Sequence, residues 1–102
     1  MKTEAQLQAY FRSAARKTGV LWRKIKFEGQ RGCPDVLIAH EGQVVLVELK
    51  SPSRTGRLSP LQRRQVTKLK RAGMTVHVVD NKEQVDDIIS KITGGAVGDD
   101  SG

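Results

Sequence analysis

The run Val44–Leu49 constrains the fold most, because it is typical of a strand buried on both faces. Its sequence, VVLVEL, is apolar or β-branched except at one position, as in the interior strands of α/β sheets. Two charges nevertheless fall in this strand or at its end, Glu48 and Lys50. Side chains two residues apart share a face of a strand, so these two are predicted to lie side by side, in line with Leu46.

A buried charge pair needs a physical reason. Burying an unpaired charge is costly, and a buried ion pair is often no more stable than apolar side chains of the same size. A structural bridge between Glu48 and Lys50 is one interpretation, but it gives little reason to place both charges there. Catalysis is a better interpretation, because a carboxylate joined by a second acid can hold a hard divalent cation such as Mg²⁺.

Asp35 is the acid predicted to join Glu48. It follows Gly32-Cys33-Pro34 at the start of a strand, and Glu41-Gly42 forms a hairpin turn between the two strands. The hairpin register could bring Asp35 opposite Glu48 or Lys50, and Asp35 and Glu48 lie six residues on either side of that turn, which is compatible with cross-strand pairing. Two carboxylates at about 4 Å repel by roughly 4 kcal/mol at an effective dielectric of about 20. A bound cation would reverse that sign.

Glu4 is a third candidate acid, because it falls in the first turn of a helix that could cover the sheet. An acid near a helix N-terminus also stabilises the helix dipole. From the residues alone, the catalytic and structural interpretations of Glu4 are equally good.

The rest of the pattern predicts one α/β domain with a mixed central sheet flanked by helices, in the order αβββαβα. The expected elements are a helix between Thr3 and Gly19, strands over Val20–Phe27, Asp35–His40 and Val44–Lys50, a helix opened by Ser59-Pro60 and ended by Gly73, a strand over Thr75–Val79, and a helix capped by Asn81. The last two strands are expected to be parallel, since a helical crossover joins them. A chain of 102 residues holds a single core, predicted over residues 1–93, with a flexible tail over 94–102.

The charge is distributed unevenly along the chain. Residues 1–79 contain sixteen Lys and Arg but five Asp and Glu, whereas residues 80–102 contain six acids and two lysines. A basic body of this kind favours a polyanionic partner, most simply nucleic acid, although membrane surfaces and acidic proteins also attract basic patches.

A cytoplasmic protein without a membrane partner is expected. No stretch approaches the roughly 18 apolar residues of a membrane span, and the N-terminus lacks the basic and then apolar regions of a secretory signal. The lone Cys33 cannot form an internal disulfide, which agrees with a reducing compartment.

Three groups of residues resemble the signature of the PD-(D/E)xK nucleases, which share the restriction-endonuclease-like fold. They are Gly32-Cys33-Pro34-Asp35, then Glu48-Leu49-Lys50 after twelve residues, and Leu58-Ser59-Pro60-Leu61-Gln62 at the start of a helix. The last group resembles the virus-type replication-repair nuclease (VRR-NUC) branch, in its small stand-alone form. The acid and lysine motif alone is degenerate, but the G-x-P-D form, the strand context and the L-S-x-x-Q helix make the resemblance fairly specific.

The resemblance implies a Mg²⁺- or Mn²⁺-dependent endodeoxyribonuclease, with metal ligands at Glu4, Asp35, Glu48 and Leu49. It implies that Lys50 positions and polarises the attacking water and that Gln62 lies near the active site, behind the catalytic groups or in contact with substrate. The candidate DNA-binding residues are Arg31, Arg54, Arg57, Ser59, Arg63 and Arg64. Related loops often carry an acid before the Leu-Ser pair, whereas this loop carries two arginines, so its substrate preference is open.

Small members of this family resemble Holliday junction resolvases. The resemblance therefore implies structure-selective cleavage of branched DNA by a homodimer, in DNA repair within a bacterial cell or a phage-infected host. Two alternatives stay open: a non-catalytic nucleic-acid-binding module with the same fold, and a nuclease for flaps, single strands or RNA.

Overall fold

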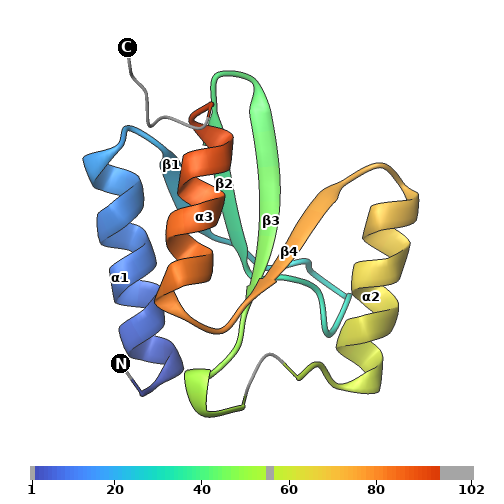
Figure 1. Cartoon of the computed structure of the whole chain (residues 1–102). Coiled ribbons are helices and arrows are strands. Elements are labelled where there is room, and N and C mark those ends of the chain that lie inside the picture. Colours follow the sequence, from blue (N-terminus) through green and yellow to red (C-terminus); the bar gives the residue numbers. More distant parts are fainter. Residues whose placement is uncertain (1, 55–56, 95–102) are drawn as a thin grey trace.

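Strand β3 (Gln43–Leu49) lies between two layers of helices, as its apolar sequence predicts (Figure 1). The structure is a computed structural model, and it describes residues 2–54 and 57–94. β3 is antiparallel to β2 and parallel to β4, and β2 is antiparallel to β1. The sheet therefore has the order β1-β2-β3-β4, with β1 at Leu21–Lys24, β2 at Val36–His40 and β4 at Thr75–Val79.

Helices α1 (Glu4–Lys17) and α3 (Lys82–Ile92) cover one face of the sheet, and α2 (Pro60–Arg71) covers the other (Figure 1). The predicted mixed sheet, the order αβββαβα and the parallel pairing of the last two strands are confirmed. The structure adds a short 3-10 turn over Pro52–Arg54.

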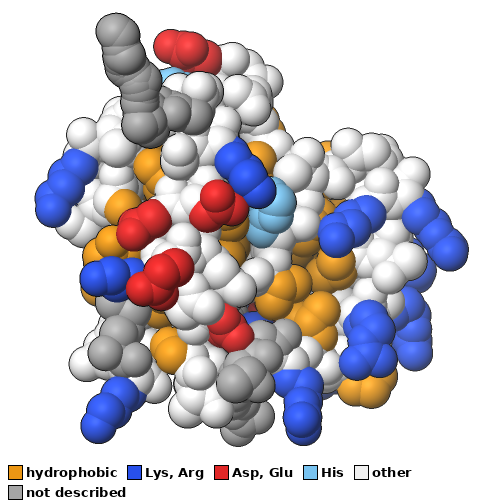
Figure 2. All heavy atoms as spheres, viewed as in Figure 1, with side chains coloured by type: hydrophobic (Ala, Val, Ile, Leu, Met, Phe, Trp, Pro, Cys, Tyr) orange, Lys and Arg blue, Asp and Glu red, His pale blue; other side chains and the backbone are white. Residues whose placement is uncertain are grey.

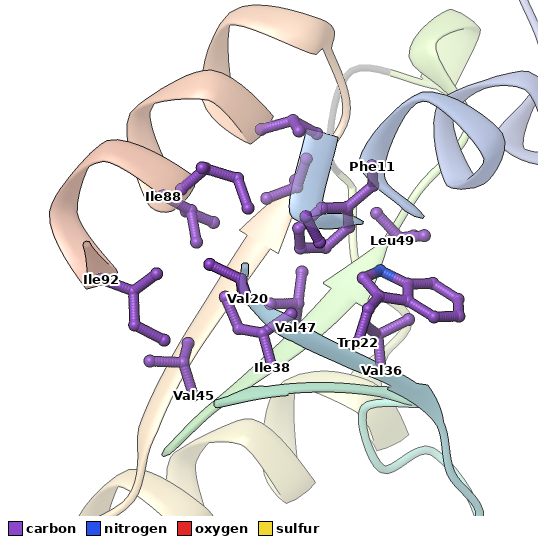
Figure 3. Close-up of a cluster of buried hydrophobic side chains, with 14 of the residues drawn as sticks. Phe11, Val20, Trp22, Val36, Ile38, Val45, Val47, Leu49, Ile88 and Ile92 are labelled. Carbon is purple, nitrogen blue, oxygen red and sulfur yellow. The ribbon is translucent and has the colours of Figure 1, made fainter. Parts of the chain in front are cut away.

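The two faces of β3 pack into separate cores. Val45, Val47 and Leu49 belong to the larger core, which lies between the sheet and helices α1 and α3 (Figure 3). Leu46 belongs to the smaller core on the α2 face, with Val66 and Val76. Because side chains alternate along a strand, Glu48 shares the face of Leu46 and is directed to the α2 side.

The predicted Glu41-Gly42 turn fixes the register of the hairpin. Both residues have positive φ, 45° and 87°, as a two-residue type I′ hairpin turn requires. The last pair of the β2–β3 ladder is Val36 with Val47. One step further along this register, Asp35 lies opposite Glu48.

The predicted caps are confirmed, but the strand ends differ slightly. Thr3, Ser59 and Asn81 cap the three helices through their side-chain oxygens. β1 ends at Lys24 rather than Phe27, although one further backbone hydrogen bond follows it, from the Ile25 N–H to the Asp35 carbonyl oxygen at 2.9 Å. The other differences are single residues: β1 begins at Leu21, β2 at Val36, and β3 spans Gln43–Leu49.

Most of the predicted tail, residues 95–102, lies outside the described residues. Within the described ranges, no helix has the length and apolar character needed to cross a membrane.

Candidate active site

The turn before Asp35 packs against the first turn of α2. Gly32 has a φ of 84°, and a Cβ at this position would lie 2.9 Å from Leu61 Cγ and 3.3 Å from the Gln62 nitrogen. The Gln65 side chain adds a hydrogen bond of 3.2 Å to the carbonyl oxygen of Arg31. Glycine is therefore needed both for the backbone conformation and for the close approach, which brings Asp35 and the start of α2 to one end of the sheet.

Glu48 is buried, with 6% of its surface exposed, although it carries a carboxylate. Its pKa is raised from 4.5 to about 7, mainly by burial and also by the nearby charge of Asp35, while Lys50 opposes the shift. A carboxyl group held in this way is costly to the fold when it is ionised. Perturbed carboxyl groups of this kind are typical of functional sites.

The Gln62 side chain forms hydrogen bonds to both Glu48 and Lys50, at the end of β3. Its Nε2 donates to Glu48 Oε2 at 3.2 Å, and its Oε1 accepts from Lys50 Nζ at 3.1 Å. The same Oε1 accepts from the backbone N–H of Ser59 at 2.9 Å, as part of the capping box of α2. The helix cap thus fixes the side chain that orients both charges.

Asp35 has two contrasting carboxylate oxygens. Oδ2 accepts from Lys24 Nζ at 2.7 Å, and the same ammonium donates to Gln8 Oε1 at 2.9 Å. Oδ1 is buried and has no hydrogen-bond partner among the described residues. An unpartnered buried carboxylate oxygen is expensive to the fold unless another ligand satisfies it.

Lys24 and Gln8 were not predicted to take part in the site. One signal was available: Lys24 is two residues from the buried Trp22 and so shares its face of β1, where a lysine is unexpected.

Two of the three candidate acids, Asp35 and Glu48, are placed to bind a divalent metal ion together. Asp35 and Glu48 face each other and offer the hard oxygen ligands that Mg²⁺ and Mn²⁺ prefer, and Mg²⁺ commonly takes one or two carboxylates together with substrate phosphate. The unpartnered Oδ1 of Asp35 is a free ligand for such an ion.

The four metal ligands predicted from the sequence do not come together in one cluster. Among residues 2–54 and 57–94, no three Asp, Glu, His or Cys side chains come together as a potential metal site. Glu4 is exposed in the first turn of α1, one turn before Leu7 anchors that helix in the core, and it acts on Glu48 only as a minor repulsive charge. The Leu49 side chain is buried in the larger core, so only its main-chain carbonyl could be a ligand.

The predicted DNA-binding residues come from the turn before Asp35, the segment after β3 and the start of α2. Arg31, Arg57, Arg63 and Arg64 are exposed. Ser59 is exposed as well, but its hydroxyl accepts from the Gln62 N–H as the cap of α2. Arg54 lies in the 3-10 turn, and its side chain is outside the described part of the structure.

The surface charge divides between helices. Acidic side chains gather over α3, whereas α2 presents lysines and arginines (Figure 2). None of the ion pairs among the described residues involves a basic side chain of α2. The α2 surface beside the candidate site is therefore strongly cationic.

The sequence and the fold match known proteins of one family. The family model of the VRR-NUC domain matches residues 2–83. A solved structure described as a VRR_NUC domain is 32% identical and superposes with a TM-score of 0.77, over 88% of this chain and 97% of that chain. No curated protein matches the chain.

Proposed function

Because this chain belongs to the VRR-NUC family, whose domain implies a nuclease-type fold, we propose that it hydrolyses phosphodiester bonds in DNA with Mg²⁺ or Mn²⁺. The observation that carries the proposal is the position of the buried Glu48, opposite Asp35 and linked through Gln62 to Lys50. This arrangement places charges in a buried strand, which lowers stability. Such destabilised charges are typical of catalytic sites, so we attribute them to catalysis.

Each residue has a distinct role in the proposed reaction. Asp35 and Glu48 would hold the metal ion, which when bound supplies positive charge at the scissile phosphate and acidifies a water molecule. Lys50, whose ammonium has three donors and gives one to Gln62, has donors left to orient the attacking water and to neutralise charge on the phosphate. Gln62 keeps Lys50 beside Glu48.

The remaining predicted residues take supporting roles in the proposal. Glu4 would add negative potential near the metal pair, and the carbonyl of Leu49 would be a further oxygen ligand. The exposed arginines around the site would contact the phosphate backbone. They are Arg31, Arg57, Arg63 and Arg64, together with Ser59 and Arg54.

We also propose that the substrate is branched DNA, such as a Holliday junction, and that the active form is a homodimer. One domain of this size makes a modest contact with DNA, whereas two sites related by a two-fold axis can cut opposed strands. Light scattering coupled to size exclusion, with and without a four-way junction, would test the dimer.

The ion pair between Lys24 and Asp35 favours a second candidate function, a nucleic-acid-binding module without catalysis. Lys24 already neutralises one oxygen of Asp35 at 2.7 Å. A structural carboxylate would need such a partner, whereas a carboxylate that binds a metal ion would have to share its charge between Lys24 and the ion. A nuclease for flaps, single strands or RNA uses the same site and differs only in substrate.

The experiment that separates these functions is cleavage of an end-labelled four-way junction beside matched linear duplex, flap, single-stranded DNA and RNA substrates. Each is incubated with Mg²⁺, Mn²⁺ or EDTA. Lys50→Ala is the test variant, and Lys91→Ala, which removes an exposed lysine on α3, is the matched control. Removing the lysine that stabilises developing charge should lower the rate by about 10²- to 10³-fold.

The proposed nuclease would be supported by paired, metal-dependent cuts in the junction. Lys50→Ala should lose these cuts, and Lys91→Ala should keep them. Preferential cutting of flaps, single strands or RNA would keep the chemistry and replace the substrate. Binding without cleavage in either metal would instead favour the non-catalytic module.

A further inference from the structure

A groove of about 530 Å³ lies between α1 and the edge strand β1, away from the basic surface of α2. Three exposed arginines line it: Arg12 and Arg16 on α1 and Arg23 on β1. Among the described residues, no Asp or Glu lines the groove, and none of the three arginines takes part in an ion pair. The groove therefore concentrates positive charge that no neighbouring carboxylate neutralises.

Two of these guanidinium groups are held in place by Trp22. Arg12 lies over the indole ring, 5.1 Å from its centroid, and Arg23 Nη1 donates to the Trp22 carbonyl oxygen at 2.9 Å. Trp22 is itself buried and packs edge-on against Phe11. Fixing a guanidinium in advance lowers the entropy lost on binding, and its planar set of donors matches phosphate.

Hydrogen bonds link the groove to the candidate active site through Gln8 and Lys24. Gln8, Arg12 and Arg16 are each four residues apart, so they follow one side of α1, over about 12 Å of helix. Gln8 lines the groove and accepts from Lys24, whose ammonium also contacts Asp35. A ligand lying along Arg16, Arg12 and Gln8 would thus come close to Lys24 and its partner Asp35.

We propose that this groove binds the phosphodiester backbone of the nucleic-acid strand that passes through the Asp35–Glu48 site. The inference rests on the proposed function, and it adds a second cationic contact surface to that of α2. A second copy of this chain is a poor occupant, since a two-fold contact would place arginines against arginines. The unpaired guanidinium groups favour a polyanion with regularly spaced charges.

The test is the salt dependence of binding to a fluorescein-labelled four-way junction and a labelled single strand, measured by anisotropy in EDTA so that no metal-dependent cleavage occurs. The test variant is Arg12→Gln/Arg16→Gln. Its matched control is Lys17→Gln/Lys91→Gln, which removes the same charge from exposed helix positions that do not line the groove. Arg23→Gln removes a groove arginine from a different element, should the helix variant fail to fold.

Each lost phosphate contact should reduce the slope of log affinity against log salt by about 0.9 on duplex DNA and about 0.7 on a single strand. For the groove variants, the slope of log affinity against log salt should become shallower by the amount that corresponds to one or two phosphate contacts. The control should show a smaller change. Equal slopes for the groove and control variants would overturn the inference.

The outcomes also separate this inference from the proposed function. If the groove variants bind like the control while the wild-type protein still cuts DNA, the groove proposal fails and the nuclease stands. If the wild-type protein binds no nucleic acid but its arginine groove captures an acidic protein, both proposals fail.

Discussion

Gln62 donates a hydrogen bond of 3.2 Å to the buried carboxylate of Glu48, from the third residue of helix α2. The same side-chain amide accepts from Lys50 and from the N-cap residue Ser59. A helix cap and the proposed catalytic pair therefore share one side chain, so the start of α2 both ends the loop after β3 and orients the charges at the end of that strand.

Gln62→Ala should lower both activity and stability. The variant loses the capping contact, which costs about 1 kcal/mol, and it releases Glu48 and Lys50, which should lower kcat by about 10- to 100-fold, as for other residues that orient catalytic groups. Gln84→Ala is the matched control: Gln84 occupies the equivalent position of α3 and contacts Asp80 and Asn81 instead. Denaturant unfolding and cleavage kinetics would measure the two effects. Equal activity losses in both variants would contradict the orienting role.

Glu48→Gln should stabilise the protein at alkaline pH. The pKa of Glu48 is raised from 4.5 to about 7, so between these values the folded protein keeps a proton that the unfolded chain has lost. Stability therefore falls as the pH rises through this window and stays low above it. At about 1.4 kcal/mol per pKa unit, the substitution should raise the free energy of unfolding by about 1 to 3 kcal/mol near pH 8 and by little near pH 4.

The measurement is chemical denaturation of both proteins across that pH range. Glu28→Gln, at an exposed acid in the turn before Gly32, is the control and should show a small change throughout. A stability gain from Glu48→Gln that is independent of pH would rule out ionisation of Glu48 as its cause.

Divalent metal should stabilise the wild-type protein in the absence of DNA. An ion that binds between Asp35 and Glu48 relieves their repulsion and binds only the folded state, which adds about 2.7 kcal/mol at a concentration of about 100 times Kd. Thermal unfolding in Mn²⁺ and in EDTA measures the difference. Asp35→Asn should abolish it, whereas Asp87→Asn, at an exposed acid of α3, should retain it. An unchanged Tm of the wild-type protein at saturating Mn²⁺ would argue against the two-carboxylate site.

Gly32→Ala should destabilise the protein more than Gly29→Ala. Both glycines have positive φ, 84° and 76°, so each substitution carries a backbone cost of about 1 kcal/mol. Only at Gly32 would the new methyl group also contact Leu61 and the backbone of Gln62. The difference between the two unfolding free energies, measured in urea, isolates the contact between the turn and α2. Equal losses would show that this close approach contributes nothing.

The sequence alone predicted the element order and the helix caps, and the position of the hairpin turn was compatible with the pairing of Asp35 with Glu48. These features depend on local rules: the two-residue period of strands, the side chains that cap helices, and the φ values that Glu41-Gly42 allows in a tight hairpin. Since the turn fixes the register, two acids equally distant from it lie opposite each other.

Which distant side chains complete the site is visible only in the folded protein. The contacts of Lys24 with Gln8 and Asp35, and of Gln62 with Glu48 and Lys50, join separate elements. Glu4 is exposed and lies outside any three-residue metal cluster of the described residues, which likewise depends on how α1 packs on the sheet. Such contacts follow from the twist of the sheet and the packing of helices on it, which no short sequence pattern encodes.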